Sequence, residues 1–527
     1  MRLVESGNGY DTGQTPPAER CDALKETHVT FDLADYRRRA EAFTGELDLE
    51  AYHHFAGLKE DCDFTAVYER YPDLFTLDAV RRLRQCYEAA VGSDERRQLS
   101  FLLNFGIEGF LGDQTKEISD EIANAESRAK ITVDGEEIGL RYSAVVLANE
   151  PDRERRRRLS DARQQVTGDQ LNPLLDRRWR RQHELVAELG YDSYVALFSE
   201  VRAVDLSLLR AATQTFLQET EGLYQRTLDK VAQAKLDLSW PELEHYDLPY
   251  LIRAPEYDGV FASELLLPTF ERTLDGLGIS LAGQPNVHVD AEVRELKSPR
   301  AFCAPVRVPD EIYLVVMPKG GQDDFQALLH EGGHTEHFAH TQAHLPFEFR
   351  FLGDNAVTEG FAFVFDHLTL NPEWLQTYLD FADSRDYLLL ANLVELYFLR
   401  RYAGKLAYET EFHAQQGPLD GMAELYHELL TDAVQIDVPR ASYLADIDDG
   451  FYVSSYLRAW MLEGALRMLL QDDYGMDWFH NPKAGEWLKM LWSTGQKYSA
   501  DQLLLKNGGG KLDAGPLRLH LERALGR

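Results

Sequence analysis

Residues 323–337 read DDFQALLHEGGHTEH, and this stretch predicts a helix that carries two imidazoles on one face. Acidic residues open the stretch, and good helix formers follow them, as is typical of a helix N-terminus. His330 and His334 are four residues apart, so both can bind one cation, with Glu331 beside them. A catalytic Zn²⁺ usually takes three protein ligands and a water, whose pKa falls to about 7. Zinc-dependent hydrolysis, with Glu331 as the general base, is therefore the leading hypothesis.

Two glycines, Gly332 and Gly333, interrupt this predicted helix. A glycine inside a helix costs about 1 kcal/mol relative to alanine. Their presence predicts that another part of the chain packs closely against the helix under the metal.

The third metal ligand is predicted to be Glu359, on a second helix that starts near Asp354 or Asn355. A loop around residues 345–347 separates the two helices. If the helices pair antiparallel, Glu359 returns to the metal. Asp354 and Asp366 are candidates to orient an imidazole by accepting its other N–H, although either is equally compatible with an ordinary solvated carboxylate.

The extended motif His330-Glu331-Gly332-Gly333-His334-Thr335-Glu336-His337 resembles the His-Glu-x-Gly-His-x-x-His motif of the thimet oligopeptidase and oligoendopeptidase F family of zinc peptidases. The resemblance covers roughly residue 170 onward and is densest from 298 to 366. It implies one Zn²⁺ per chain, with Glu359 as the third ligand. A fourth protein ligand would close the open catalytic position, so His337 is expected to pack rather than to bind the metal.

Two further segments resemble the same family. Residues 300–305 and 311–317 look like its strand region, whose exposed edge pairs with an extended substrate. A buried structural strand is also expected there, and the two interpretations are compatible. Residues 450–460 are similar to its tyrosine-rich wall, where Tyr452 and Tyr456 would stabilise the oxyanion. Aromatic residues at this spacing are also compatible with an ordinary core.

The chain departs from the family opposite the metal. A histidine expected five or six residues before Tyr452 is replaced by Asp446 or Ile447, and a tyrosine expected between the two tyrosines is replaced by Ser454. Substrate handling on this wall is therefore expected to differ. Arg458 is either a replacement charge-binding group or a solvated side chain.

Composition indicates a folded protein and argues against two classes of binding partner. The 527 residues are 44% apolar and 27% charged, with a formal net charge of −33. This charge argues against nucleic acid and anionic membrane as partners. No apolar run reaches 18 residues, no signal peptide is evident, and four cysteines (Cys21, Cys62, Cys86 and Cys303) show no metal-type pairing. We expect a soluble, cytoplasmic protein.

The predicted fold is mainly α, two-lobed, with a small β-sheet beside the active-site helix and, by resemblance, a deep central channel. A flexible tail is predicted over 1–28, a helical N-terminal lobe over 29–290 and a catalytic zinc-binding lobe over 291–527. Residues 131–138 predict a β-hairpin with an Asp-Gly turn, and the basic run 153–158 is expected to be a solvated helix face.

The function expected from these features is hydrolysis of short peptides at internal bonds. Two alternatives stay open. A metallo-carboxypeptidase or other exopeptidase on a related helical scaffold would need a cationic pocket for the substrate carboxylate. A zinc-containing peptide-binding protein with reduced catalysis would have no use for Glu331.

Overall fold

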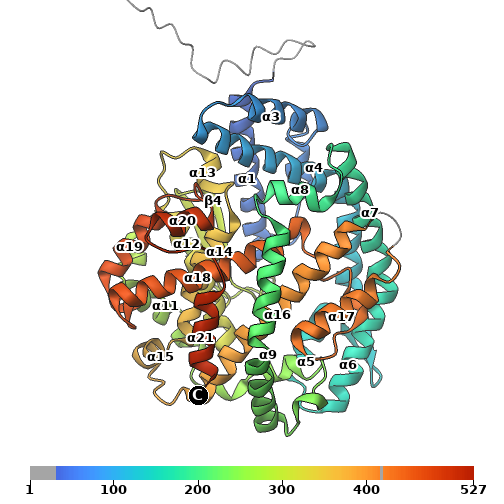
Figure 1. Cartoon of the computed structure of the whole chain (residues 1–527), viewed down its shortest axis with the longest axis vertical. Helices are drawn as coiled ribbons and strands as arrows, with labels where there is room; N and C mark the ends of the chain where they lie inside the picture. The colour runs from blue at the N-terminus through green and yellow to red at the C-terminus, as the bar shows by residue number, and fades with distance from the viewer. Residues whose placement is uncertain (1–30, 416–418, 527) are drawn as a thin grey trace, which may run out of the picture.

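Helices follow one another along most of the chain, as the apolar spacing predicts (Figure 1). The computed structural model describes residues 31–415 and 419–526, so the predicted tail over 1–28 and Cys21 lie outside the described residues. The helices before the sheet are α1 (Leu33–Phe55), α2 (Phe64–Glu69), α3 (Leu77–Ala89), α4 (Ser93–Arg128), α5 (Leu140–Asn149), α6 (Arg153–Val166), α7 (Asn172–Glu188), α8 (Tyr194–Val201), α9 (Leu206–Leu236), α10 (Leu248–Arg253) and α11 (Leu266–Gly276).

A second set of helices follows the sheet and includes the motif. They are α12 (Gln322–His340), α13 (Phe347–Phe351), α14 (Asn355–Asp366), α15 (Pro372–Leu379), α16 (Arg385–Ala414), α17 (Met422–Val434), α18 (Tyr452–Tyr474), α19 (Pro482–Trp492), α20 (Ala500–Lys506) and α21 (Gly515–Leu525). The motif lies within α12 and the predicted second helix is α14, so both predicted helices are confirmed.

The predicted hairpin is formed by β1 (Lys130–Val133) and β2 (Glu136–Gly139), which pair antiparallel. Asp134 and Gly135 both have positive φ, 55° and 84°. Two such residues are what a two-residue turn needs to follow the twist of its strands.

A three-stranded sheet lies beside α12, as predicted. Its strands are β3 (Val287–Asp290), β4 (Phe302–Arg307) and β5 (Glu311–Val315), in the order β3-β5-β4, with β3 parallel and β4 antiparallel to β5. β4 is therefore an edge strand. α1 packs on this edge so closely that a Cβ at Gly45 would lie 2.8 Å from the carbonyl oxygen of Val306.

Two large hydrophobic cores support the helices. One joins buried residues of α1 to α9 with residues of α16, α17 and α21. The other joins α11, α12, α14, α15, α19 and α20. α18 contributes to both, through Leu457 and Met461 to the first core and through Leu462 and Leu466 to the second. The fold is therefore mainly α, while the boundary near residue 290 and the central channel stay predictions.

The basic run 153–158 differs from its expected role as a solvated face. Arg156 is 3% exposed, and with Arg153 it pairs with the fully buried carboxylate of Asp247. The other arginines of the run do pair with exposed carboxylates. A local charge pattern could not predict the buried pairs, because Asp247 is about ninety residues further along the chain.

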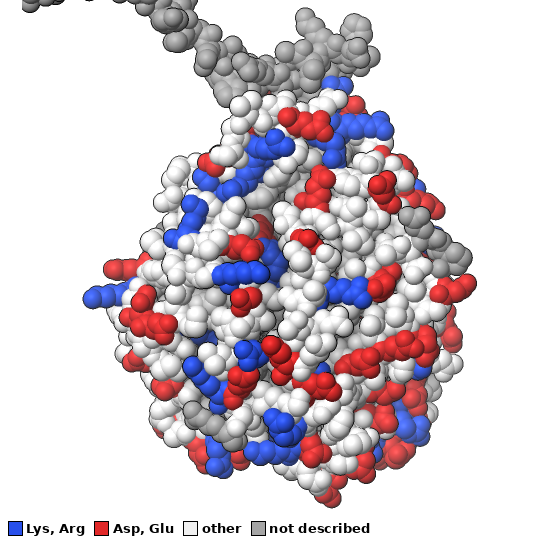
Figure 2. All heavy atoms as spheres, in the orientation of Figure 1, with Lys and Arg blue, Asp and Glu red and all other residues white. Residues whose placement is uncertain are grey.

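Charged side chains are spread over the face of the molecule that Figure 2 shows. Figure 2 shows acidic groups across the whole viewed face, with basic groups between them and no continuous basic surface. Within the described residues, no helix combines the length and the apolar character needed to cross a bilayer.

Candidate metal centre

The candidate centre lies where α12 and α14 pack together. His330, early in the motif, faces Asp366 at the end of α14, whereas His334, one turn later, faces Thr358 and Glu359 near its start. The two helices therefore run antiparallel, as predicted. This direction brings Glu359 back toward the motif.

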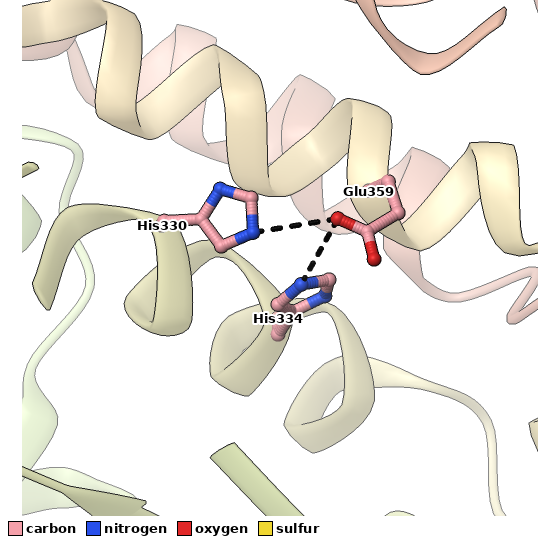
Figure 3. Close-up of side chains that lie close together, drawn as sticks. All are labelled: His330, His334 and Glu359. Carbon is pink, nitrogen blue, oxygen red and sulfur yellow. Dashed lines mark ion pairs between the residues drawn. The ribbon is translucent and has the colours of Figure 1, made fainter. Parts of the chain in front are cut away.

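Two imidazoles of α12 point at one carboxylate oxygen of α14 (Figure 3). The Nε2 atoms of His330 and His334 lie 3.3 and 3.6 Å from Glu359 Oε2. Two ligands at ordinary bond lengths from a tetrahedral Zn²⁺ are about 3.4 Å apart. Glu359 is 6% exposed, and its Oε2 has no hydrogen-bond partner among the residues that the structure describes. A buried, unpartnered oxygen facing two nitrogens at this spacing fits a metal ion, so these residues are suited to hold Zn²⁺.

Hydrogen bonds behind the two rings orient them. His330 Nδ1 lies 3.0 Å from Asp366 Oδ2, and His334 Nδ1 lies 2.8 Å from Thr358 Oγ1. With each Nδ1 engaged in this way, each Nε2 is left facing Glu359. Asp366 thus contacts an imidazole as predicted. Thr358 was not predicted, although its position next to Glu359 on the second helix was the available signal.

Burial and mutual attraction set the protonation of this cluster. Burial acts to lower the pKa of His330, but Asp366 and Glu359 outweigh it and raise the pKa to about 10. Burial acts to raise the pKa of Glu359, but the two imidazoles hold it well below its ordinary value. Burial raises the pKa of Asp366 to about 7. A cation must displace protons from such a cluster, so its affinity falls as pH falls.

Asp354 does not orient an imidazole, contrary to one of the sequence predictions. Its carboxylate accepts two hydrogen bonds from Arg458, at 2.9 and 2.7 Å, and also caps the N-terminus of α14 through the Ala356 N–H. Arg458 is buried and also reaches Asp501. It is therefore neither solvated nor free to bind another charge. The pair instead fixes the start of α14 against α18.

The glycines of the motif are explained by close packing, as predicted. A Cβ at Gly333 would lie 2.6 Å from Ala362 Cα, and one at Gly332 would lie 2.3 Å from the ring of Phe270. Gly333 therefore lets the backbones of α12 and α14 approach closely. This approach sets the distance between the histidines and Glu359.

Replacing Gly333 with alanine is expected to push α12 and α14 apart, because the new Cβ meets backbone that cannot turn aside. We expect a loss of about 1–3 kcal/mol in the free energy of unfolding, as is typical of overpacked cores. A misplacement of the histidines would also lower kcat/KM by up to about 100-fold. Chemical denaturation and peptide hydrolysis measure the two effects. Gly168→Ala is the control, since its Cβ would meet no atom within 4 Å; equal effects would contradict the packing argument.

Glu331 is held between the motif helix and the edge strand. Its Oε2 accepts a hydrogen bond of 2.9 Å from the Cys303 N–H of β4. The carboxylate is thus fixed beside the two histidines. Sequence reasoning missed this contact, because a backbone donor leaves no trace in residue identity.

The two predicted tyrosines lie on one face of α18 but make different contacts. Tyr452 donates a hydrogen bond of 2.7 Å to Glu359 Oε1. The Tyr456 hydroxyl makes no hydrogen bond within the part of the chain that the structure describes, and its ring packs 5.1 Å from that of Tyr452. Burial and the charge of Glu359 raise the pKa of both phenols well above the ordinary value. Both therefore stay protonated at neutral pH, and each can donate a hydrogen bond.

His337 packs inside the protein, as expected. It is fully buried, its ring lies 4.9 Å from that of Phe361, and it is not among the three residues that converge at the candidate centre. Burial lowers its pKa to about 3.

Comparison with known proteins shows the fold. No family model matches the chain, and no curated protein matches it by sequence. A solved structure from Bacillus anthracis str. Ames, described as a "putative oligoendopeptidase F", matches 93% of this chain and 89% of that one, with a TM-score of 0.64 and 14% sequence identity. The chain has the oligoendopeptidase F fold. The predicted mainly α, two-lobed architecture agrees with it.

At three positions, Asp446, Ile447 and Ser454, this chain was expected to depart from the residues of the resembled family. The structure places buried or paired side chains at all three. Asp446 accepts hydrogen bonds from Arg401 and Tyr426, at 2.8 and 2.7 Å. Ile447 is buried, and Ser454 is fully buried. Asp446 therefore ties the segment before α18 to α16 and α17 instead of presenting an imidazole.

Proposed function

We propose that this chain is a zinc-dependent oligopeptidase that hydrolyses internal bonds of short peptides. The observation that carries the proposal is the convergence of His330 and His334 on the unpartnered Glu359 Oε2, with Glu331 fixed beside them. The same fold occurs in a protein described as a "putative oligoendopeptidase F", which supports the proposal.

In this proposal His330, His334 and Glu359 hold the ion. Bound Zn²⁺ would polarise the scissile carbonyl and acidify a coordinated water. Glu331 accepts the proton of the attacking water and passes it to the leaving amine. The Cys303 N–H keeps the Glu331 carboxylate in place before the proton arrives.

The tyrosines divide two tasks. Tyr456, whose hydroxyl is uncommitted, donates to the oxyanion that develops as the carbonyl is attacked. Tyr452 donates its hydroxyl hydrogen bond to Glu359 and so positions that carboxylate. We infer this division because one phenol cannot donate its single proton to both acceptors.

The two phenylalanine variants are expected to separate these tasks. Tyr456→Phe should lower kcat by about 10²–10³-fold, as for the loss of one oxyanion donor, with zinc affinity unchanged. Tyr452→Phe should weaken zinc binding by about 10–100-fold, as for the loss of a group that orients a ligand. Steady-state kinetics and competition with a zinc indicator measure the two quantities. Equal losses of kcat and zinc affinity in both variants would contradict the division.

Product analysis tests the proposed reaction. A mixed library of short peptides is incubated with zinc-loaded protein and, in parallel, with protein stripped by a chelator, and the products are identified by mass spectrometry. Internal cuts that need zinc support the proposal. Losses of single terminal residues would shift it to an exopeptidase, and binding without cleavage to a peptide-binding protein.

The cations near the tyrosine wall do not favour an exopeptidase. Arg401 pairs with Asp446 at 2.8 Å, and Lys405 pairs with Asp448 at 2.7 Å. Arg458 is committed to Asp354. None of these three cations is therefore uncommitted and available to bind a substrate carboxylate.

A further inference from the structure

A second group of metal-ligating side chains lies outside the candidate centre. His367, in the 3₁₀ turn His367–Leu370 that follows α14, meets Glu395 of α16 and His520 of α21. One ligand atom of each lies within 4.8 Å of the others. These residues come from three distant parts of the sequence, so only the fold brings them together. We call them the His367–Glu395–His520 cluster.

The carboxylate of this cluster, Glu395, has one oxygen, Oε2, that is buried without a hydrogen bond from a described residue. No lysine or arginine in residues 31–415 or 419–526 forms an ion pair with Glu395, whose only ionic contact there is His367. A buried carboxylate oxygen left in this way is costly unless a cation or donor is bound.

The distance between His367 and Glu395 suits two ligands of one metal ion. His367 is 6% exposed, and its Nδ1 lies 3.4 Å from Glu395 Oε1. This distance is about that between two ligands of one tetrahedral Zn²⁺, and it is long for a direct hydrogen bond. The candidate centre itself shows the same spacing, at 3.3 and 3.6 Å.

Asn392 sets the tautomer of the third residue. Its Nδ2 donates to the Leu388 carbonyl at 2.7 Å, which directs its Oδ1 toward His520 Nε2 at 2.9 Å. His520 Nε2 must therefore carry the hydrogen, and Nδ1 keeps its lone pair. The ring is thus prepared to bind a cation through Nδ1.

Neighbouring charges do not add to the attraction for a cation, because burial, followed by Arg467, lowers the pKa of both His367 and His520. Glu463 Oε1 lies 3.9 Å from His367 Nδ1, although Glu463 is itself neutralised by Arg467 at 2.6 Å. Glu395 is therefore the carboxylate that a cation would neutralise.

The geometry points to a second divalent-cation site, of the Zn²⁺ class, formed by His367, Glu395 and His520. Two imidazoles and one carboxylate are donors that such ions prefer. A cation here would fasten the end of α14 to α16 and α21. Since His367 directly follows Asp366, which holds His330, the site would also steady the candidate centre. The inference goes beyond the proposed function and does not depend on it.

Counting bound metal tests the site. The full chain is stripped with a chelator, reloaded with Zn²⁺, desalted and analysed by elemental mass spectrometry. We expect two zinc ions per chain in the wild type, and one in a His330→Ala/His334→Ala variant that lacks the candidate centre. Adding His520→Ala or Glu395→Gln to that variant should remove the remaining ion. Zn²⁺ should also raise the Tm of the double variant, and this rise should disappear with the added change.

The control is His183→Ala, which removes a half-buried histidine outside the cluster and should leave the zinc count unchanged. A double variant that binds no zinc would overturn the second site, and this result needs no change within the cluster. Zinc retained after both His520→Ala and Glu395→Gln would also overturn it, because the ion would then lie elsewhere. Loss of peptide hydrolysis alone would bear only on the proposed function.

Discussion

Replacing Glu331 with glutamine is expected to lower kcat by about 10²–10⁴-fold, the usual contribution of a general base. The amide has nearly the shape of the carboxylate, and its oxygen can still accept the hydrogen bond from the Cys303 N–H. It cannot accept the proton of the attacking water. Because His330, His334 and Glu359 are untouched, the zinc content should stay unchanged. Hydrolysis of a fluorogenic short peptide and elemental analysis measure the two quantities.

The matched control is Asp323→Asn, which removes a carboxylate from the first turn of the same helix. Asp323 is not among the three converging residues, so this variant should retain turnover. Hydrolysis near the wild-type rate in Glu331→Gln would show that Glu331 is not the general base. A loss of zinc in that variant would show that the change acts through the metal centre instead.

Replacing Arg458 with alanine is expected to lower the free energy of unfolding by about 3–5 kcal/mol, as for removal of one partner of a buried ion pair. Asp354 would keep its charge at the buried start of α14 with no cation to offset it. Removing that charge as well, in Arg458→Ala/Asp354→Asn, should recover part of the loss. Chemical denaturation followed by circular dichroism measures each step.

Arg518→Ala is the control for the Arg458 prediction, because its pair with Glu219 is 37% and 51% exposed. Such a pair contributes about 0–1 kcal/mol. Similar losses in the two variants would contradict the argument from burial.

The wild-type pair should also make stability depend on pH. Burial raises the pKa of Asp354, but Arg458 outweighs it and holds the pKa below the ordinary value. The pair therefore stabilises the fold fully above the ordinary aspartate pKa, about 3.9, and loses this effect as pH falls through the lowered pKa. Arg458→Ala should lack this part of the acid transition.

Local residue order determined the elements of the candidate centre. The spacing of His330 and His334 required a helix to bring them to one face, and the cap at Asp354 marked where α14 begins. The Asp-Gly pair at 134–135 specified a tight hairpin turn. These features were predictable because each depends on residues within a few positions of one another.

The tertiary structure alone determined which groups meet across those elements. The sequence offered Asp354 and Asp366 equally as partners for an imidazole, yet packing gives Asp366 to His330 and Asp354 to Arg458. The Cys303 N–H reaches Glu331 from a strand. The His367–Glu395–His520 cluster spans about 150 residues. Residue order cannot specify such contacts, because they depend on how helices pack, and that packing is set by the shapes of both cores together.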